Sequence, residues 1–241
     1  MNIVFESGKI YGIVGYNGSG KSVLLKCICG FLTLDSGEIE INGKKLKKDI
    51  DMIQDAGVII EEPAFLKIDM IQDAGVIIEE PAFLKEYSGK RNLEFLYSIR
   101  NKLNPEVMSK AMRLVGLDEN SKKKVKNYSL GMKQRLAIAQ AIMENPKILL
   151  LDEPMNGLDK NGVQEIRELL LDLKKQDKTI VLVSHNQEDI RVLCDELYEI
   201  ENGMLVKKKS GTILLKKIIF DIKNHSDILM IVLVDEYTGN L

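Results

Sequence analysis

The sequence predicts an α/β layer fold with a mostly parallel central sheet. Two segments, Ile148 to Leu151 and Thr179 to Val183, are apolar throughout, which is typical of strands buried between layers of helices. A third short apolar run, Lys9 to Val14, leads into a glycine-rich loop. Segments with helical periodicity separate these runs, and strands that alternate with helices indicate a parallel sheet.

Four segments are predicted to be helical: Lys21 to Cys29, Gly89 to Val115, Leu130 to Asn145 and Lys160 to Gln176. The second is interrupted near Asn104-Pro105, and Pro146 stops the third. In the fourth, Asp159 is placed to cap the amino end, and Lys174 and Lys175 lie at the negative end of the helix dipole.

Two Asn-Gly pairs predict hairpins. Glu38 to Leu46 alternates polar and apolar residues around Asn42-Gly43, which favours a type I′ turn. Leu197 to Val206 contains the second pair, Asn202-Gly203, and is expected to close in the same way.

Composition places the chain among ordinary globular proteins. Its 241 residues are 45% apolar and 29% charged, which suits one or two domains and excludes disordered and collagen-like classes. The 34 basic and 36 acidic residues nearly cancel, so no nucleic-acid partner is expected. Three cysteines are too few for a disulfide scaffold or a zinc site, which favours a reduced compartment.

Membrane and export signals are not found in the sequence. The longest apolar runs are far shorter than the roughly 20 residues that a spanning helix needs. The amino-terminal residues Met1 to Gly8 lack the basic start and apolar run of a signal peptide.

An 18-residue segment occurs twice without a difference. Ile50 to Lys67 reads IDMIQDAGVIIEEPAFLK, and Ile68 to Lys85 repeats it. Solenoid repeats diverge and recur, so this one indicates a single tandem duplication or a sequence error. We expect one copy to enter the sheet and the other to be extruded as a loop, because identical segments compete for one position.

The glycine-rich loop has the pattern of a phosphate-binding loop. Gly15 to Ser22 reads GYNGSGKS, which satisfies G-x-x-x-x-G-K-[ST] between a strand and a helix. Its backbone N–H groups and the helix dipole favour an anion. The nucleotide-binding residues are expected to be Gly15, Tyr16, Asn17, Gly18, Ser19, Gly20, Lys21, Ser22 and the next residue, Val23. Lys21 is expected to reach the β and γ phosphates, and the Ser22 hydroxyl to ligate Mg²⁺.

Paired carboxylates end the strand Ile148 to Leu151. In α/β sheets ligands bind beyond the carboxyl ends of the strands, which is where Asp152 is expected. We expect Asp152 to hold Mg²⁺ through its water shell and Glu153 to act as the general base toward water. Adjacent acids after a strand usually form a solvated turn, and it is the loop at Gly15 that favours the functional interpretation.

Three further segments are ambiguous on their own. Ser129 to Arg135 reads SLGMKQR and could be an ordinary helix start with Ser129 as its cap. Asn156 to Asp159 follows the acid pair. His185 follows a strand, and a lone histidine there is more often structural than catalytic.

Taken in order, GYNGSGKS, YSLGMKQR, ILLLDEPMNGLD and VLVSH resemble the ATP-binding subunit of ABC transporters over nearly the whole chain. The resemblance implies a P-loop NTPase fold of the ABC ATPase type with a helical subdomain. It implies that two subunits sandwich two ATP molecules, each bound by one subunit's loop and the other's Ser129 and Gly131. It also implies that Asn156 to Asp159 link the two sites and that His185 contacts the γ phosphate.

The sequence departs from the family pattern in two segments. Leu130 and Met132 stand in the signature segment where glycine and glutamine are common. In the loop that usually carries a Mg²⁺-sensing glutamine, the two copies of the repeat place Glu61 and Glu79, and Glu79 is the expected metal contact. A Glu-Pro there, before the helix of Ser88 to Leu96, resembles the branch for export of, or immunity to, bacitracin-like and lantibiotic peptides.

The resemblance also divides the chain. Residues 1–85 and 130–209 are expected to form the ATPase core, 86–129 the helical signature subdomain, and 210–241 an extension of unknown role. Family members have about 25 further residues before the equivalent of Glu6, including an aromatic that stacks on adenine, and no residue here matches it.

The leading interpretation is a cytoplasmic ATPase that uses ATP and Mg²⁺, works as a homodimer or ABC-subunit dimer, and lies on the inner face of the membrane bound to a separate permease. A soluble ABC-type regulatory ATPase and a truncated, inactive remnant are the alternatives. We expect the duplication to impair or uncouple function.

Overall fold

The computed structural model describes residues 2–53, 56–60, 75–78, 83–201, 204–208 and 228–232. The helices are α1 (Lys21–Cys29), α2 (Gly89–Ser98), α3 (Pro105–Leu114), α4 (Leu130–Ile142), α5 (Lys160–Lys175) and α6 (Gln187–Leu193), with a 3₁₀ turn, η2 (Val125–Asn127). The strands are β1 (Asn2–Glu6), β2 (Ile10–Gly15), β3 (Glu38–Ile41), β4 (Lys44–Lys45), β5 (Ala56–Ile60), β6 (Gly75–Ile78), β7 (Ile148–Asp152), β8 (Thr179–Val183), β9 (Glu196–Glu201), β10 (Met204–Lys208) and β11 (Ile228–Val232). No described helix has the length and apolarity needed to cross a membrane.

The larger sheet is mostly parallel, as predicted. Its seven strands have the order β10-β9-β2-β8-β7-β5-β6, and all neighbours pair in parallel except β9 and β10. Because β8 lies between β2 and β7, the carboxyl ends of these three strands meet at one edge. The phosphate loop, the acid pair and His185 all follow these ends, so topology brings them together.

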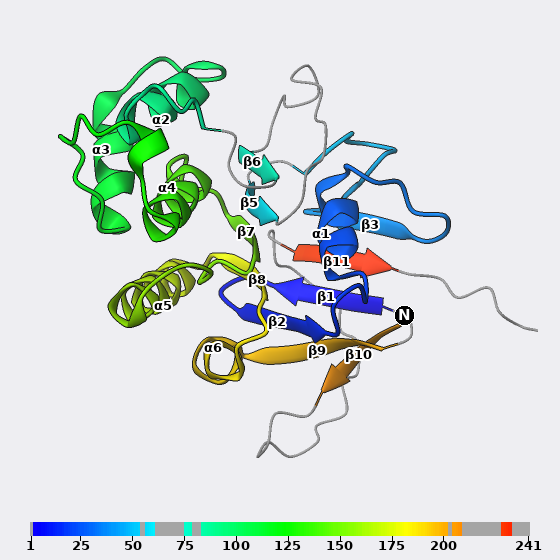
Figure 1. Ribbon diagram of the computed structural model, residues 1–241. Helices are drawn as coiled ribbons and strands as arrows, with labels where there is room; N and C mark the ends of the chain where they lie inside the picture. Colours follow the sequence, from blue (N-terminus) through cyan, green and yellow to red (C-terminus); the bar gives the residue numbers. More distant parts are fainter. Residues whose placement is uncertain are drawn as a thin grey trace, which may run out of the picture.

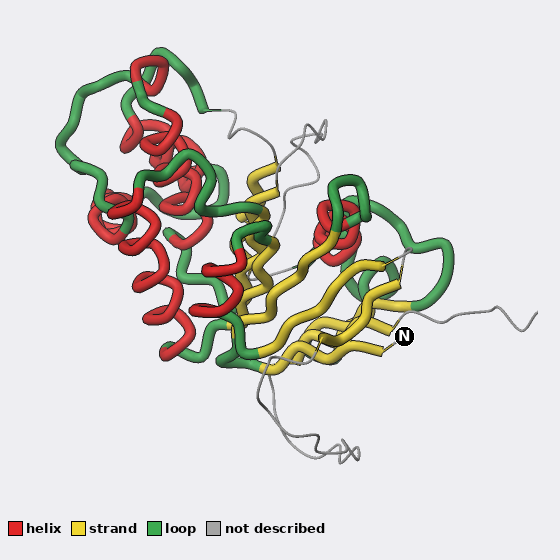
Figure 2. The backbone as a smooth tube through the Cα atoms, turned by 60° about the horizontal axis from the view of Figure 1, so that its bottom comes forward, coloured by secondary structure: helices red, strands yellow, loops and turns green. Residues whose placement is uncertain are grey.

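Helices cover both faces of this sheet. Figure 2 shows α1 on one side of the strands and the remaining helices on the other. Along β7 the side chains alternate between two cores: Leu149 and Leu151 pack in the one that contains α3, α4 and α5, whereas Ile148 and Leu150 pack in the one that contains α1. This alternation explains why β7 is apolar throughout, since both of its faces are buried.

A second sheet of four antiparallel strands has the order β1-β11-β3-β4. Strand β11 comes from residues 210–241, the segment to which the sequence assigned no role, and it lies between β1 and β3 (Figure 1). Ile3 and Phe5 of β1 and Ile39 and Ile41 of β3 share the core that α1 covers. The second sheet is therefore packed onto the phosphate-loop side of the molecule.

The expected extrusion of one repeat copy is wrong. Both copies supply a strand: β5 belongs to the first and β6 to the second, and they pair in parallel with Gly57 opposite Gly75. Strand β5 lies between β7 and β6, so β6 becomes the edge strand. A parallel sheet accepts the extra copy by adding it at an edge, where one free row of backbone groups is available, so the copies do not have to compete for one position.

The predicted cap of α5, the break near Asn104-Pro105 and the first turn are confirmed, whereas α4 ends at Ile142 and not at the predicted Asn145. Asp159 accepts a hydrogen bond from the Gly162 N–H and caps α5. The interrupted segment forms α2 and α3, and Asn104 caps the second of these with Pro105 as its first residue. Between β3 and β4, Asn42 and Gly43 both have positive φ, at 52° and 77°, as a type I′ turn requires. Strands β9 and β10 form the second hairpin.

Candidate nucleotide-binding site

The backbone of the loop between β2 and α1 surrounds the Lys21 side chain. The Lys21 ammonium donates to the carbonyl oxygens of Gly15 and Tyr16, at 2.9 and 3.0 Å, and its side chain is buried. Gly18 and Gly20 have φ of 78° and 102°, a backbone region that residues other than glycine rarely adopt. The glycines of the motif are therefore required by backbone geometry, as the pattern predicts.

The backbone of this loop is open at two glycines, as the approach of a phosphate group requires. A Cβ built on Gly18 or Gly20 meets no heavy atom within 4 Å, so the backbone there faces open space. The Ser19 hydroxyl oxygen is buried without a hydrogen-bond partner among the described residues. The amino end of α1 adds unpaired N–H groups and a partial positive charge. These groups and Lys21 can all donate to one anion.

The two predicted magnesium ligands that are described lie together. Ser22 Oγ donates to Asp152 Oδ2 at 2.6 Å, although the residues are 130 positions apart, and Asp152 is buried. Hydroxyl and carboxylate oxygens are the ligands that Mg²⁺ prefers, and this ion usually takes only one or two from protein beside phosphate and water. Within the described ranges, no group of three or more His, Cys, Asp or Glu could hold a metal. The pair therefore fits a Mg²⁺ ion that phosphate oxygens also bind. Glu79 and Glu61 lie outside the described residues.

The predicted base and histidine also lie together. His185 Nε2 is 3.4 Å from Glu153 Oε1, and the Glu153 side chain is nearly buried while that of His185 is half-exposed. Glu153 has a φ of 47°, which is uncommon for this residue type. Its N–H donates to Val183 O at 3.0 Å, which ties the end of β7 to the end of β8. This strained backbone holds the carboxylate beside His185.

The signature segment lies on the other side of the sheet. Ser129 caps α4 by accepting a hydrogen bond from the Met132 N–H at 3.2 Å. A Cβ on Gly131 would stand 2.8 Å from Gly157 O, so the start of α4 packs closely against the Asn156–Asp159 turn. Since α1 and α4 cover opposite faces of the strands (Figure 2), Ser129 and Gly131 are separated from the phosphate loop of their own chain.

Three further polar residues lie around the site, and the sequence patterns gave none of them a role of its own. Gln134 Nε2 donates to Pro154 O at 3.1 Å and so connects α4 to the segment after Glu153. Asp189 is fully buried and is paired with Arg167 of α5. The sequence gives only a weak indication that Asp189 is buried, because a charged residue in a short amphipathic helix usually faces solvent.

The remaining residues of the predicted loop face outward. Tyr16 is 82% exposed and Val23 is 53% exposed, and Asn17 is also exposed. A subunit or nucleotide that covers the loop would therefore contact these side chains first.

Comparison with known proteins supports the same site. The family described as ABC transporter matches residues 1–156. YybJ of Bacillus subtilis, an uncharacterized ABC transporter ATP-binding protein, is 39% identical over 217 residues, which are 90% of each chain. The bacitracin transport ATP-binding protein BcrA of Enterococcus faecalis is 34% identical over 86% of this chain, which spans only 62% of BcrA. The lantibiotic transport ATP-binding protein SrtF of Streptococcus pyogenes is 33% identical, over 87% of this chain and 82% of SrtF.

The fold has solved counterparts. The ATP-binding cassette MJ0796, in a dimeric post-hydrolysis state bound to ADP and Pi, superposes with a TM-score of 0.68 over 86% of this chain and 88% of that one, at 23% identity. This likeness confirms the predicted P-loop ATPase fold. The relatives confirm the predicted resemblance to the bacitracin and lantibiotic branch. The chain therefore belongs to the ABC transporter family, as one of its ATP-binding, ATP-hydrolysing subunits.

Proposed function

We propose that this subunit binds ATP with Mg²⁺ at the Gly15–Ser22 loop and uses hydrolysis to drive export of, or immunity to, a peptide antibiotic through a separate membrane permease. The observation that carries the proposal is the convergence of the loop lysine with two pairs of side chains: Lys21 lies within the loop, Ser22 pairs with Asp152, and Glu153 lies beside His185. Positioning and charge neutralisation are what phosphoryl transfer needs from a protein.

In this proposal each residue has one role. Lys21 and the loop N–H groups bind the β and γ phosphates. Ser22 and Asp152 hold the Mg²⁺ ion that neutralises phosphate charge. Glu153 accepts a proton from the attacking water, and His185 contacts the γ phosphate.

We propose that a complete site needs two subunits. Ser129 and Gly131 lie at the start of α4, on the face of the sheet opposite α1, so they would contact ATP held by a second copy or a related subunit. The exposure of Tyr16 and Val23 suits a surface that such a partner covers. Residues 86–129 are proposed as the helical subdomain beside the core of 1–85 and 130–209 (Figure 1). With its permease, the subunit would lie on the cytoplasmic face of the membrane.

The relatives support the choice of cargo. BcrA and SrtF are named for bacitracin and lantibiotic transport, and this chain is at least 33% identical to each. Expression of the subunit with its candidate permease should therefore raise resistance to a bacitracin-like or lantibiotic peptide.

The central test uses the Glu153→Gln variant. Removing the base should lower the rate of phosphate release by about 100-fold or more. The variant should retain ATP and elute as a dimer with Mg²⁺ and ATP, but as a monomer without them. The matched control is the double variant Glu153→Gln with Lys21→Ala, which should bind no ATP and remain monomeric. If wild-type protein neither binds ATP nor releases phosphate, the proposal fails and the inactive remnant is the correct interpretation.

A further inference from the structure

One buried ion pair lies beside the histidine of the site. Asp189, in the first turn of α6, has no exposed surface. Its Oδ1 accepts hydrogen bonds from Arg167 Nε at 2.9 Å and Nη2 at 2.5 Å, and the Arg167 side chain is 13% exposed. Because two charges lose their hydration when they are buried, such a pair contributes little net stability compared with apolar residues of the same size. We therefore expect this pair to have a role other than stabilising the fold.

The second oxygen of Asp189 connects the pair to His185. Asp189 Oδ2 accepts a hydrogen bond from Ser184 Oγ at 3.1 Å, and Ser184 is 2% exposed. The same Ser184 oxygen accepts a hydrogen bond from the Asn186 N–H at 3.1 Å. Both chain neighbours of His185 are thus held by one hydroxyl group, whose orientation Asp189 determines.

The other end of the pair belongs to α5. This helix begins at Lys160, directly after the Asn156–Asp159 turn, and Asp159 caps it. Arg167 therefore joins the helix that follows the turn to the segment that carries His185. His185 itself makes its described contact with Glu153, at 3.4 Å, with a half-exposed side chain. The position of its imidazole depends on the backbone that Ser184 and Asn186 hold.

We infer that Asp189 is a positioning residue for ATP hydrolysis: through Ser184 it holds His185 beside Glu153, and through Arg167 it ties this segment to α5. The inference rests on the role proposed above for His185 and extends it to three residues, Ser184, Asp189 and Arg167, to which the proposed function assigns no contact with ATP. Removal of the connection should slow hydrolysis by displacing His185, without weakening the capture of ATP by the loop at Gly15.

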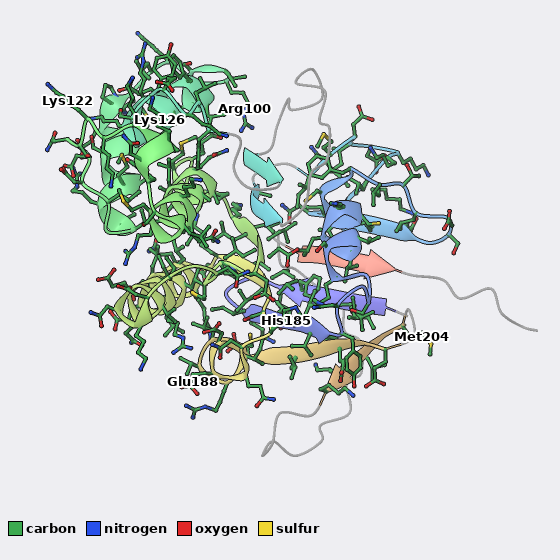
Figure 3. The ribbon with its side chains drawn as sticks, viewed as in Figure 1. Arg100, Lys122, Lys126, His185, Glu188 and Met204 are labelled. Carbon is green, nitrogen blue, oxygen red and sulfur yellow. The ribbon has the colours of Figure 1, made fainter. Side chains whose placement is uncertain are left out.

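The sharpest variant is Ser184→Ala, because it removes the connection and leaves the ion pair of Asp189 and Arg167 intact. We expect kcat for ATP hydrolysis to fall about tenfold, while the Kd for ATP stays within twofold and Tm changes little. Ser184→Thr keeps the hydroxyl and should restore kcat. Asp189→Asn should lower kcat at least as much. The matched control is Glu188→Gln, whose kcat should be unchanged. Glu188 is the chain neighbour of Asp189, but it is exposed and pairs with Arg191. It lies on the outer side of α6, away from His185 (Figure 3).

His185→Ala separates this inference from the proposed function. If His185→Ala leaves kcat unchanged, the proposed role of the histidine is wrong. If His185→Ala lowers kcat but Ser184→Ala does not, only the positioning inference is overturned. A double variant, Ser184→Ala with His185→Ala, should be no slower than His185→Ala alone, because both changes act through one imidazole. A further additive loss would contradict the inference. So would a fall in Tm for Ser184→Ala with kcat per folded molecule preserved. Should Asp189→Asn fail to fold, the Ser184 variants decide the question.

Discussion

The duplicated segment allows the strand order to be tested with an internal control, because the same residue occurs once in each copy. Gly57 of β5 and Gly75 of β6 are copies of the same residue and pair with one another. Gly57 lies in an interior strand under the carboxyl end of α4, whereas β6 is the edge strand. Gly57→Ala and Gly75→Ala are therefore chemically identical changes at structurally different places.

The magnitude for Gly57→Ala follows from the space around it. A Cβ at Gly57 would lie 2.0 Å from Ala141 O and 2.7 Å from Leu149 Cδ2. Real Cβ atoms are essentially never found within 3.0 Å of such neighbours. The backbone of α4 must therefore move away by about 1 Å, and overpacking of this kind costs about 1–3 kcal/mol. For a chain of this size, that cost lowers Tm by about 5 °C. Among the described strands none lies beyond β6, so this edge strand can shift to accommodate the methyl group of Gly75→Ala, and we expect a smaller loss.

The assay is thermal and urea unfolding of both variants beside the wild type, followed by circular dichroism. An unchanged urea m-value would show that the variants unfold as the wild type does. If Gly75→Ala lowered Tm more than Gly57→Ala, the second copy would be the interior strand and the order deduced here would be wrong. Equal effects would contradict the assignment of β6 to the edge.

Three further outcomes are expected. Ser22→Ala should weaken the dependence of ATP binding on Mg²⁺, measured by titration with and without the ion, because it removes one of the two oxygens paired at 2.6 Å; an unchanged dependence would exclude Ser22 as a ligand. Gly157→Ala should lower the free energy of unfolding by about 1–3 kcal/mol, since φ is 73° and the new Cβ would lie 2.5 Å from Leu130 Cγ. The double variant with Leu130→Gly should recover part of that loss in urea unfolding. If the two single losses simply add, the contact with Leu130 is not the cause. Burial raises the pKa of the Cys29 thiol, and burial together with nearby Asp195 raises that of Cys194 to about 12. A raised thiol pKa favours the neutral form, so the stability it gives is complete below the unfolded value of about 8.5 and is lost as the pH rises from there toward 12. At pH 8 Cys29 and Cys194 should accordingly react slowly with a disulfide reagent in the native protein and quickly after unfolding, and fast modification of either residue, located by peptide mapping, would contradict its raised thiol pKa.

The sequence by itself determined the features that depend on neighbouring residues. The loop of Gly15 to Ser22 needs glycine at positive φ, and the motif states that requirement directly. The caps at Asp159 and Ser129 and the turn at Asn42-Gly43 could be predicted for the same reason, because each is decided within four residues. Order and spacing of four such motifs were enough to identify the family.

The tertiary structure decided what depends on long-range pairing. Ser22 and Asp152 meet because β8 lies between β2 and β7, an order that no local pattern specifies. The expectation that one repeat copy is extruded was wrong because edge addition to a sheet is a property of the whole sheet. Strand β11 lies between β1 and β3, more than 180 residues along the chain from both, so its pairing could not be read from its own apolar run. Asp189 and Arg167 were missed because a charge appears buried only when the surrounding helices are in place; the net energy of such pairs depends on that burial and not on residue type.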